Sequence, residues 1–534
     1  MKADLILHNA KIYTVDPQTP WAEAAAVANG RFLAIGSNQD ILELASPGTK
    51  VVDGNGRLAL PGLTDAHVHF LQVAIRKRQV SLFGLADFAA VERAVATAVS
   101  RTPADQWVIG WGWDENLWGF APTAAHLDAI AADRPIVLAR MDMHTWWVNS
   151  AALRLAGIDA QTPDPPESKI ERDENGRPTG LLREWNAIEL VERHIPDPDE
   201  ATLEIWLREA IGDAHRLGLT GIHDLRVERE GRQSFHLWQK LRRQGELKLR
   251  VHMNLAADFL READTLGLQP GFGDELLWIG HAKCFADGTM GSRTASMLEP
   301  FVGEPDNNGV IVTSAQELWE MASLAAQGGF PMSVHAIGDR AVREVLDVLG
   351  ERQTLDGPGG LLLPHRIEHV QVIHPDDIPR LARHNIVASM QPVHLLTDWP
   401  TADAVWGARA RYAYAFRSLL DQGTHLAFGS DAPVAPLNPM LGIYAALTRQ
   451  NEAGLPAEGW YPEERLTLAE TIWAYTMGPA RLAGKTAVQG SITPGKWADL
   501  ILLEQDLFAI PPAEIKDVQV GLTLFAGEVV FERV

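Results

Sequence analysis

The sequence predicts an α/β protein: a (β/α)8 barrel with a small β-sandwich-like domain built from both termini and an insertion after the first barrel strand. Three observations predict it. Short apolar runs alternate with helical patterns in the middle of the chain, strand-like runs separated by turns occupy both ends, and one gap between runs is too long for a crossover helix. We therefore assign 1–59 and 485–534 to the β domain and 60–484 to the barrel, with the insertion at about 71–218.

The two ends of the chain share a pattern of strands and turns. Near the start, turn signals such as Asn29-Gly30 and Asn55-Gly56 separate strand-like runs at 5–7, 11–15, 25–28 and 32–35. Near the other end, Pro494-Gly495 and Ala526-Gly527 separate runs at 498–503, 521–525 and 529–531. Neither end has enough strands for a sandwich alone, so we expect the two ends to pack together.

The middle of the chain alternates between strand-like and helical segments. Helical patterns such as 315–327, 340–349 and 375–384 separate eight apolar runs: 60–70, 219–225, 249–255, 278–285, 331–337, 366–370, 386–391 and 425–430. Strands that alternate with helices favour a parallel sheet, and eight such units favour a closed barrel. The gap at 71–218 is interpreted as an insertion that caps the barrel mouth.

Composition excludes several classes of function. The 534 residues carry 47 Lys and Arg against 69 Asp and Glu, a net charge of −22, which disfavours nucleic-acid and anionic-lipid partners. A single cysteine, Cys284, excludes an internal disulfide and a cysteine-based zinc cluster. The first residues lack the pattern of a secretory signal, and no apolar run approaches the roughly 20 residues of a membrane helix. We therefore expect a cytoplasmic protein.

Many of the apolar runs end in a side chain that can bind metal. The first contains Asp65-Ala66-His67-Val68-His69, and residues two apart on a strand face the same way, so His67 and His69 can hold one ion. Four later runs end at or near further candidates, namely Lys283, His335, His369 and Asp431. The C-terminal ends of barrel strands converge on one mouth, so this order predicts one polar cluster.

Each candidate has a structural alternative when it is taken alone. A lone His-x-His pair, His335 or His369 is more often an ordinary core or surface histidine than a ligand. Asp431, in Asp-Ala-Pro, fits a turn or a helix N-cap, and Lys283 can pair with an acid such as Asp287. The regular order of these residues at the ends of strand-like runs favours the functional interpretation.

The candidates lie within sequence words that resemble the amidohydrolase superfamily, and within it the YtcJ-like (amidohydrolase 3) branch, which includes N-substituted formamide deformylases. These short motifs are at 64–69, 112–114, 144 with 147–153, 287–295, 335–341, 366–369 and 430–434. Pro61-Gly62-Leu63 and the segment 490–500 extend the resemblance to both ends. The resemblance therefore covers essentially the whole chain, and it specifies a family but not a substrate.

The resemblance implies two divalent metal ions as cofactors. One ion would be bound by His67, His69 and Asp431, and the second by His335 and His369. Zinc is the expected ion because the ligand atoms are nitrogen and oxygen. Manganese, iron and nickel are the alternatives for the ion. A mononuclear site that uses only some of these ligands is the alternative to two ions.

Lys283 matches the position at which many members of the superfamily carry a carboxylated lysine that bridges both ions. A neutral lysine can add carbon dioxide and become a carbamate anion, and two nearby dications favour an anion over an ammonium group. The resemblance therefore implies a carboxylated Lys283.

The resemblance also implies the reaction, which is hydrolysis of an amide-type C–N bond in a small molecule by a metal-activated hydroxide. A metal ion lowers the pKa of bound water from 15.7 towards about 7. Asp431 is expected to take the proton and pass it to the leaving nitrogen. The alternatives are another electrophile at the same site, such as a lactone, a carbamate or a ring that is deaminated, and a non-catalytic barrel. The complete set of ligands argues against the last.

The predicted insertion is rich in tryptophan. It holds eight of the 17 tryptophans: Trp107, Trp111, Trp113, Trp118, Trp146, Trp147, Trp185 and Trp206. They form either the insertion's own core or an aromatic wall for an apolar or aromatic-substituted substrate. The candidate substrate contacts are Trp113, Trp147, Asp114, His144, Glu184, His223 and Arg293. Arg293 has the alternative of pairing with an internal carboxylate. The resemblance further suggests a homodimer as the oligomeric state to test.

Overall fold

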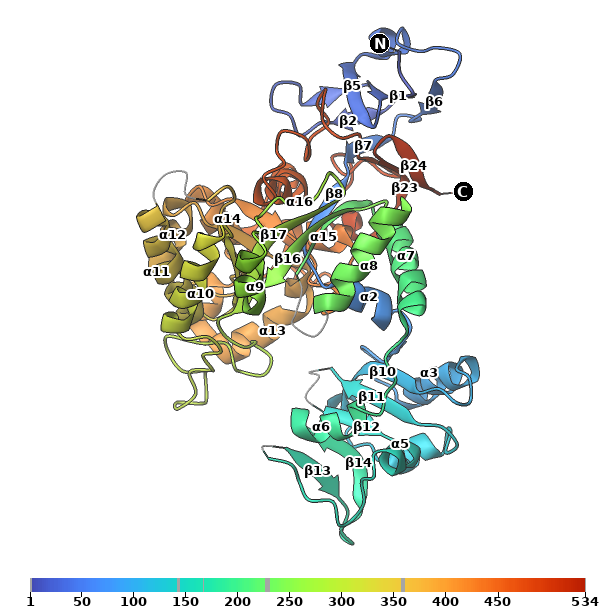
Figure 1. The fold of residues 1–534 in the computed structure, drawn as a ribbon, viewed down its shortest axis with the longest axis vertical. Helices are drawn as coiled ribbons and strands as arrows, with labels where there is room; N and C mark the ends of the chain where they lie inside the picture. Colours follow the sequence, from blue (N-terminus) through green and yellow to red (C-terminus); the bar gives the residue numbers. More distant parts are fainter. Residues whose placement is uncertain (1, 142–144, 167, 226–230, 357–360, 534) are drawn as a thin grey trace. The chain divides into compact units, whose positions relative to one another are not determined.

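The computed structural model describes residues 2–141, 145–166, 168–225, 231–356 and 361–533. The chain forms two compact units, which are shown in Figure 1. The larger unit consists of Met1–Val73 together with Leu207–Val534, and the smaller consists of Ala74–Trp206.

One parallel sheet organises the larger unit. Among the described residues it has eight strands: β8 (Leu63–Val68), β15 (Leu219–Asp224), β16 (Arg250–Ala256), β17 (Leu277–Phe285), β18 (Met332–Ala336), β19 (Arg366–His369), β20 (Val387–Met390) and β21 (Leu426–Phe428). The two edge strands meet through a bridge between Val68 and Ala432 and through the Asp431 N–H, which donates to the carbonyl oxygen of His67 at 2.7 Å. The sheet therefore closes as a barrel, and the predicted fold class is confirmed.

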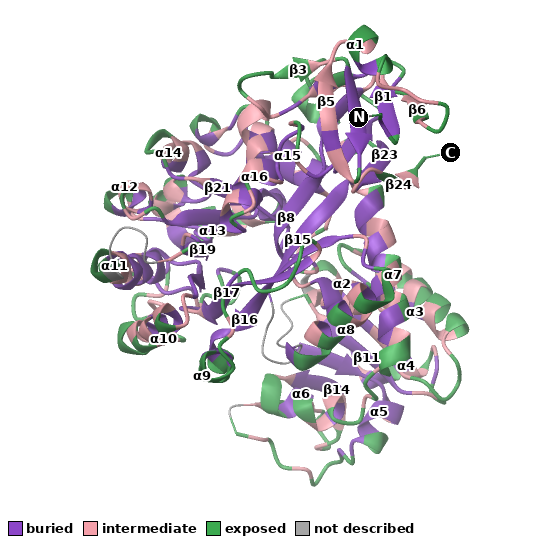
Figure 2. Ribbon diagram, turned by 45° about the horizontal axis from the view of Figure 1, so that its top comes forward, coloured by how far each residue is buried: buried purple, intermediate pink, exposed green. Residues whose placement is uncertain are grey.

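Helices follow most of the barrel strands. The helices that lie wholly or partly in the larger unit, apart from α1, are α2 (Phe70–Arg76), α7 (Glu200–Arg216), α8 (Gly231–Gln244), α9 (Leu260–Thr265), α10 (Ala315–Gln327), α11 (Asp339–Asp356), α12 (Ile378–Arg383), α13 (Leu395–Trp406), α14 (Phe416–Asp421), α15 (Pro439–Thr448) and α16 (Leu468–Leu482). Figure 2 shows buried strands inside helices whose outer faces are exposed, as expected when a parallel sheet is covered on both faces. Short 3-10 turns join them: η3 (Ala257–Phe259), η4 (Pro375–Asp377), η5 (Pro392–His394), η6 (Gly407–Tyr412) and η7 (Pro462–Glu464).

The first apolar run, predicted as one strand over 60–70, is two strands. β7 (Leu58–Pro61) pairs with a C-terminal strand, and only β8 belongs to the barrel. The break falls at Pro61-Gly62, where a Cβ on residue 62 would lie 2.2 Å from Oγ1 of Thr220. Glycine at this position lets the backbone pass close to β15 while the chain leaves one sheet for the other.

The two termini build one β domain, as predicted. One sheet contains β1 (Leu5–His8), β4 (Ala24–Ala28), β5 (Arg31–Gly36) and β6 (Lys50–Asp53), and α1 (Asn38–Leu42) packs against it. A second sheet combines both ends: β2 (Lys11–Tyr13), β3 (Trp21–Ala22), β7, β22 (Leu500–Leu503), β23 (Val520–Phe525) and β24 (Glu528–Glu532), with η8 (Pro512–Asp517) between β22 and β23. One apolar cluster joins Leu5 and Val27 with Leu502 and Leu524.

The smaller unit has a sheet and cores of its own. Its elements are β9 (Val80–Ser81), α3 (Phe88–Arg101), β10 (Val108–Trp113), η1 (Glu115–Leu117), α4 (Ala124–Asp128), β11 (Ile136–Arg140), β12 (Thr145–Val148), α5 (Ser150–Leu155), β13 (Lys169–Arg172), β14 (Pro178–Arg183) and α6 (Trp185–Glu192). In the part of the chain that the structure describes, no helix is long and apolar enough to cross a membrane.

Candidate metal centre

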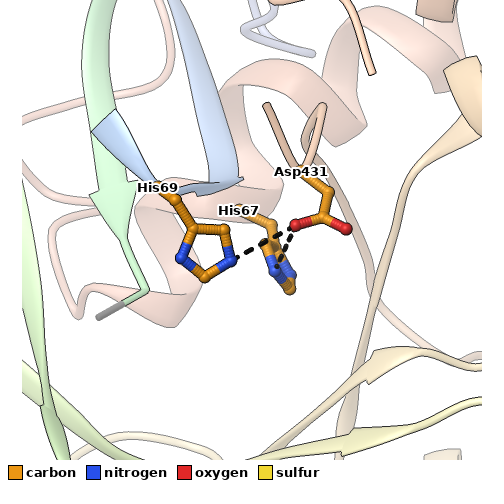
Figure 3. A group of neighbouring side chains, drawn as sticks. All are labelled: His67, His69 and Asp431. Carbon is orange, nitrogen blue, oxygen red and sulfur yellow. Dashed lines mark ion pairs between the residues drawn. The ribbon is translucent and has the colours of Figure 1, made fainter. Parts of the chain in front are cut away.

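His67, His69 and Asp431 come together where the first and last barrel strands meet (Figure 3). His67 is on β8, His69 follows that strand, and Asp431 follows β21. The buried carboxylate of Asp65 joins the two segments, because it accepts hydrogen bonds from the N–H of His67 and from the N–H and hydroxyl of Ser430. We call His67, His69 and Asp431 the first triad.

The geometry of the first triad fits a metal ion. Oδ1 of Asp431 lies 3.2 Å from Nε2 of His67 and 3.4 Å from Nε2 of His69. Four ligands at about 2.1 Å from a tetrahedral zinc ion are separated from one another by about 3.4 Å. The two measured edges therefore match a shared ion, and the donor set of two imidazoles and a carboxylate is one that zinc accepts.

A second group of possible ligands shares Asp431. Each of His369, His394 and Asp431 offers one ligand atom, and these atoms lie within 4.8 Å of one another. His369 ends β19, and His394 ends η5, the turn after β20. We call this group the second triad; all three of its residues are buried.

Backbone conformation at the site is unusual. His369 and Asp431 have positive φ angles, 73° and 58°, although neither is glycine. A non-glycine residue in this region costs on the order of 1–3 kcal/mol, and such residues concentrate at functional sites. The surrounding fold therefore holds two possible ligands in conformations that the chain would not adopt locally.

Buried acceptors lie behind the imidazoles of His67 and His369. Nδ1 of His67 lies 2.8 Å from Oε2 of Glu368, and Nδ1 of His369 lies 2.8 Å from Oε1 of Gln391. When each Nδ1–H donates to its acceptor, each Nε2 is left to face a metal ion. Arg366 in turn forms an ion pair with Glu368 and donates to the Ala66 carbonyl at 2.6 Å.

Charges in the site reinforce this arrangement. Burial alone would raise the pKa of Glu368, but Arg366 and His67 hold it well below its usual value. The pKa of Asp431 is also well below its usual value, against the effect of burial, because of His67 and His69. Burial, together with the nearby His335, holds the pKa of His369 well below its usual range. Two carboxylates therefore stay anionic and the imidazole of His369 stays neutral, as metal binding requires. Against the effect of burial, the same two carboxylates raise the pKa of His67, so a cation that binds there would displace its proton.

Lys283 and His335 lie near the triads but belong to neither. The ring of His335 is 4.5 Å from that of His369, and its Nε2 lies 3.0 Å from the carbonyl oxygen of Gly288, so Nδ1 is the nitrogen that could bind a metal ion. Nζ of Lys283 donates to the Cys284 carbonyl at 3.2 Å and lies over the ring of Phe285. Burial lowers the pKa of Lys283 to about 8.

Two of the predicted substrate contacts in the larger unit have protein partners. His223 is buried, its ring stacks on His252 at 4.3 Å, and its Nδ1 lies 3.1 Å from a nitrogen of Arg366. Arg293 forms an exposed ion pair with Glu304, which is the carboxylate pairing that the sequence left open as its alternative.

The predicted contacts in the smaller unit divide into three kinds. Trp113 and Trp147 are buried in one of that unit's own cores, and their indole N–H groups donate to the Leu138 and Thr123 carbonyl oxygens. The core alone accounts for both tryptophans. Asp114 pairs with Arg140 at 3.3 Å, and Glu184 is an exposed residue with a positive φ just before α6. His144 lies outside the described residues.

Sequence reasoning missed His394, Glu368 and Gln391. Glu368 lies in the family-like motif at 366–369. Residues two apart on a strand share a face, so its spacing from Arg366 on a buried strand could have indicated an ion pair between them. Gln391 ends the seventh apolar run and His394 follows it, but no candidate ligand was assigned to that run. A histidine in the turn after a barrel strand was the signal available for His394.

Fold and site together define a barrel protein with possible metal ligands at the C-terminal ends of its strands. A model of the amidohydrolase family matches residues 50–531. YtcJ of Bacillus subtilis (strain 168) is 32% identical, over all of both chains, and the N-substituted formamide deformylase of Arthrobacter pascens is 29% identical, over 99% of this chain and 98% of its own. The chain therefore belongs to the amidohydrolase family.

A solved structure agrees with this assignment. An uncharacterized metal-dependent hydrolase from Pyrococcus furiosus is 27% identical, with a TM-score of 0.77 over 94% of this chain and 99% of that one. Its similarity extends over nearly the full length of both chains, so it includes the barrel and the β domain.

Proposed function

We propose that this amidohydrolase hydrolyses an amide-type C–N bond of a small molecule at the first triad. The observation that carries the proposal is the pair of distances, 3.2 Å and 3.4 Å, from one oxygen of Asp431 to Nε2 of His67 and His69. The deformylase relative, which acts on a formamide by its name, supports the choice of a C–N bond. Support for an apolar substituent is weaker than the sequence indicated, because Trp113 and Trp147 are core residues.

The residues of the first triad would bind the metal ion and transfer the proton. His67, His69 and Asp431 would hold a divalent ion, for which zinc is our choice from the donor set. When bound, such an ion polarises a substrate carbonyl and lowers the pKa of water. Oδ1 of Asp431 is the oxygen paired with both histidines, so Oδ2 would accept the proton of the attacking water. The same carboxyl group then returns that proton to the leaving nitrogen.

We further propose a second divalent ion beside the first. His335 and His369 are the ligands that family resemblance suggests for it, and their neighbouring rings support this role. Carboxylation of Lys283 is part of the proposal. Its lowered pKa of about 8 supports it, because a larger fraction of the amine is neutral and able to add carbon dioxide.

The proposal is tested with purified full-length protein. Zinc, manganese, iron and nickel are first counted per chain by elemental analysis. The metal-loaded protein is then assayed against panels of amides, N-substituted formamides, lactones and carbamates. We expect turnover of an amide or formamide that a chelator abolishes and added metal restores. Turnover of lactones or carbamates alone would contradict C–N hydrolysis, and activity that survives complete metal removal would contradict the metal centre.

A further inference from the structure

His394 is positioned as part of the metal centre although it lies outside the ligand pattern that we derived from the sequence. It ends the η5 turn, which begins directly after Gln391, and Gln391 itself bonds to Nδ1 of the ligand His369. The His394 ring stacks near that of His369, with centroids 6.3 Å apart and an angle of 19° between the planes. The short segment 391–394 thus provides both the acceptor for Nδ1 of His369 and a second imidazole beside it.

The imidazole of His394 has an unused nitrogen that faces the site. His394 is 8% exposed, and among the described residues its Nε2 has no hydrogen-bond partner. The nearest carboxylate oxygen is Oδ2 of Asp431, at 3.8 Å. This distance is too long for a hydrogen bond, but two atoms that each bind one ion at about 2.1 Å are separated by up to about 4.2 Å.

We propose that His394 is a metal ligand, which binds a cation together with His369 and Asp431. Asp431 would then join two positions, with Oδ1 directed to the first triad and Oδ2 to the second. A carboxylate oxygen carries two lone pairs, so Oδ2 can bind the cation and still accept the proton of the attacking water. Nε2 of His369 is the free nitrogen of its ring, because Nδ1 bonds to Gln391. The proposal rests on the metal centre proposed above and adds to it a ligand from the turn after the seventh barrel strand.

This ligand set does not depend on Lys283. Nζ of that residue bonds to a backbone carbonyl, and the ligand atoms of the second triad already lie within 4.8 Å of one another. Two imidazoles and a carboxylate suit zinc in the same way as the first triad does. His394 can therefore hold the cation whether or not the lysine is carboxylated.

The first test counts and titrates metal in the full-length chain. Wild type, His394→Asn and a control, His8→Asn in strand β1, are loaded with zinc and analysed by elemental analysis and by competition with a chelator. We expect His394→Asn to weaken one ion by more than about 100-fold, since changing a residue that merely supports a ligand already costs about 10–100-fold. The control should match wild type. Equal stoichiometry and affinity in all three proteins would overturn the proposal.

The second test separates a ligand from a residue that only shapes the site. His394→Cys and His394→Ser are loaded with cobalt(II), and their absorption spectra are compared. A thiolate bound to cobalt gives a charge-transfer band that serine cannot give, so we expect that band in the cysteine variant alone. No such band in a folded, cobalt-loaded His394→Cys protein would overturn the proposal. A wild-type chain that binds no divalent ion would instead remove the whole metal centre.

Discussion

Nδ1 of His67 lies 2.8 Å from Oε2 of Glu368, and both side chains are buried. This contact joins β8 to β19 across the interior of the barrel and fixes which nitrogen of His67 can bind metal. Arg366 keeps Glu368 anionic, so a carboxylate, and not a neutral acceptor, supports the ligand. A carboxylate behind a metal-binding histidine raises the basicity of the ring as well as holding it in place.

Glu368→Gln should therefore weaken the metal centre without removing a ligand. Glutamine keeps an acceptor for Nδ1 of His67 but loses the charge, and we expect a loss of metal affinity of about 10–100-fold. Competition of the zinc-loaded protein with a chelator measures it. The control is Glu344→Gln, which neutralises a carboxylate in the ion pair with Arg340 on α11. Equal affinity in the two variants would show that Glu368 does not support the ligand.

Asp431→Asn should retain metal binding but lose most of the turnover. The amide oxygen of asparagine can still face His67 and His69, so at least one ion should stay bound. Asparagine cannot accept the proton of the attacking water, and loss of general acid–base catalysis costs about 10²–10⁴-fold in rate. Elemental analysis and kcat, measured on the same preparation, check both expectations. Metal retention together with near wild-type turnover would remove Asp431 from the proton transfer.

The fold was largely predictable because its signals are local. Apolar runs and helical stretches alternate along the chain, and parallel strands buried on both faces are continuously apolar. The strand boundary at Pro61-Gly62 was not predicted, because the apolar run continues through it. The two strands separate only because each pairs with a different part of the chain, Leu500–Leu503 in one case and Leu219–Asp224 in the other.

The site was predictable only where the ligands end strands. His67, His69, His369 and Asp431 were predicted in this way, and the structure brings them together in two groups that share Asp431. His394 was missed because it comes from a turn, whose path over the barrel mouth depends on tertiary packing. The support from Gln391 also requires knowing which strands are neighbours, since it lies one strand away from His369.

The barrel interior holds histidines that are packed too tightly for a methyl group beside them. Nδ1 of His252 accepts the indole N–H of Trp278 at 2.8 Å, and its Nε2 lies 3.1 Å from Nδ1 of His281. A Cβ on Gly280 would lie 1.7 Å from Nε2 of His252. Gly280→Ala should therefore lower the free energy of unfolding by about 1–3 kcal/mol or more, as overpacking of a core does.

Gly212→Ala is the matched control for this change. Gly212 is in α7, and a Cβ there meets no atom within 4 Å. Alanine in a helix interior is more favourable than glycine by about 0.5–1 kcal/mol, so this variant should be slightly more stable than wild type. Urea unfolding of the three proteins tests both expectations, and a Gly280→Ala variant as stable as wild type would contradict the packing argument.

Buried histidines should also make the protein sensitive to mild acid. Burial lowers the pKa of His365 from 6.5 to about 4, and its Nδ1 accepts the N–H of Met332 at 2.9 Å. Because the unfolded chain binds this proton more tightly than the native protein, the contribution of His365 to stability is present above about pH 6.5 and is lost as pH falls towards 4. Linkage gives about 2 kcal/mol lost by pH 5.

His365→Asn isolates this contribution. The Oδ1 atom of asparagine can accept the same N–H from Met332 but does not titrate in this range. Both proteins are unfolded with urea between pH 7 and pH 5, after removal of metal so that ligand protonation is the same in each. We expect the free energy of unfolding of the variant to fall less steeply with pH than that of wild type. Parallel pH profiles would mean that His365 is protonated in the native protein as readily as in the unfolded chain.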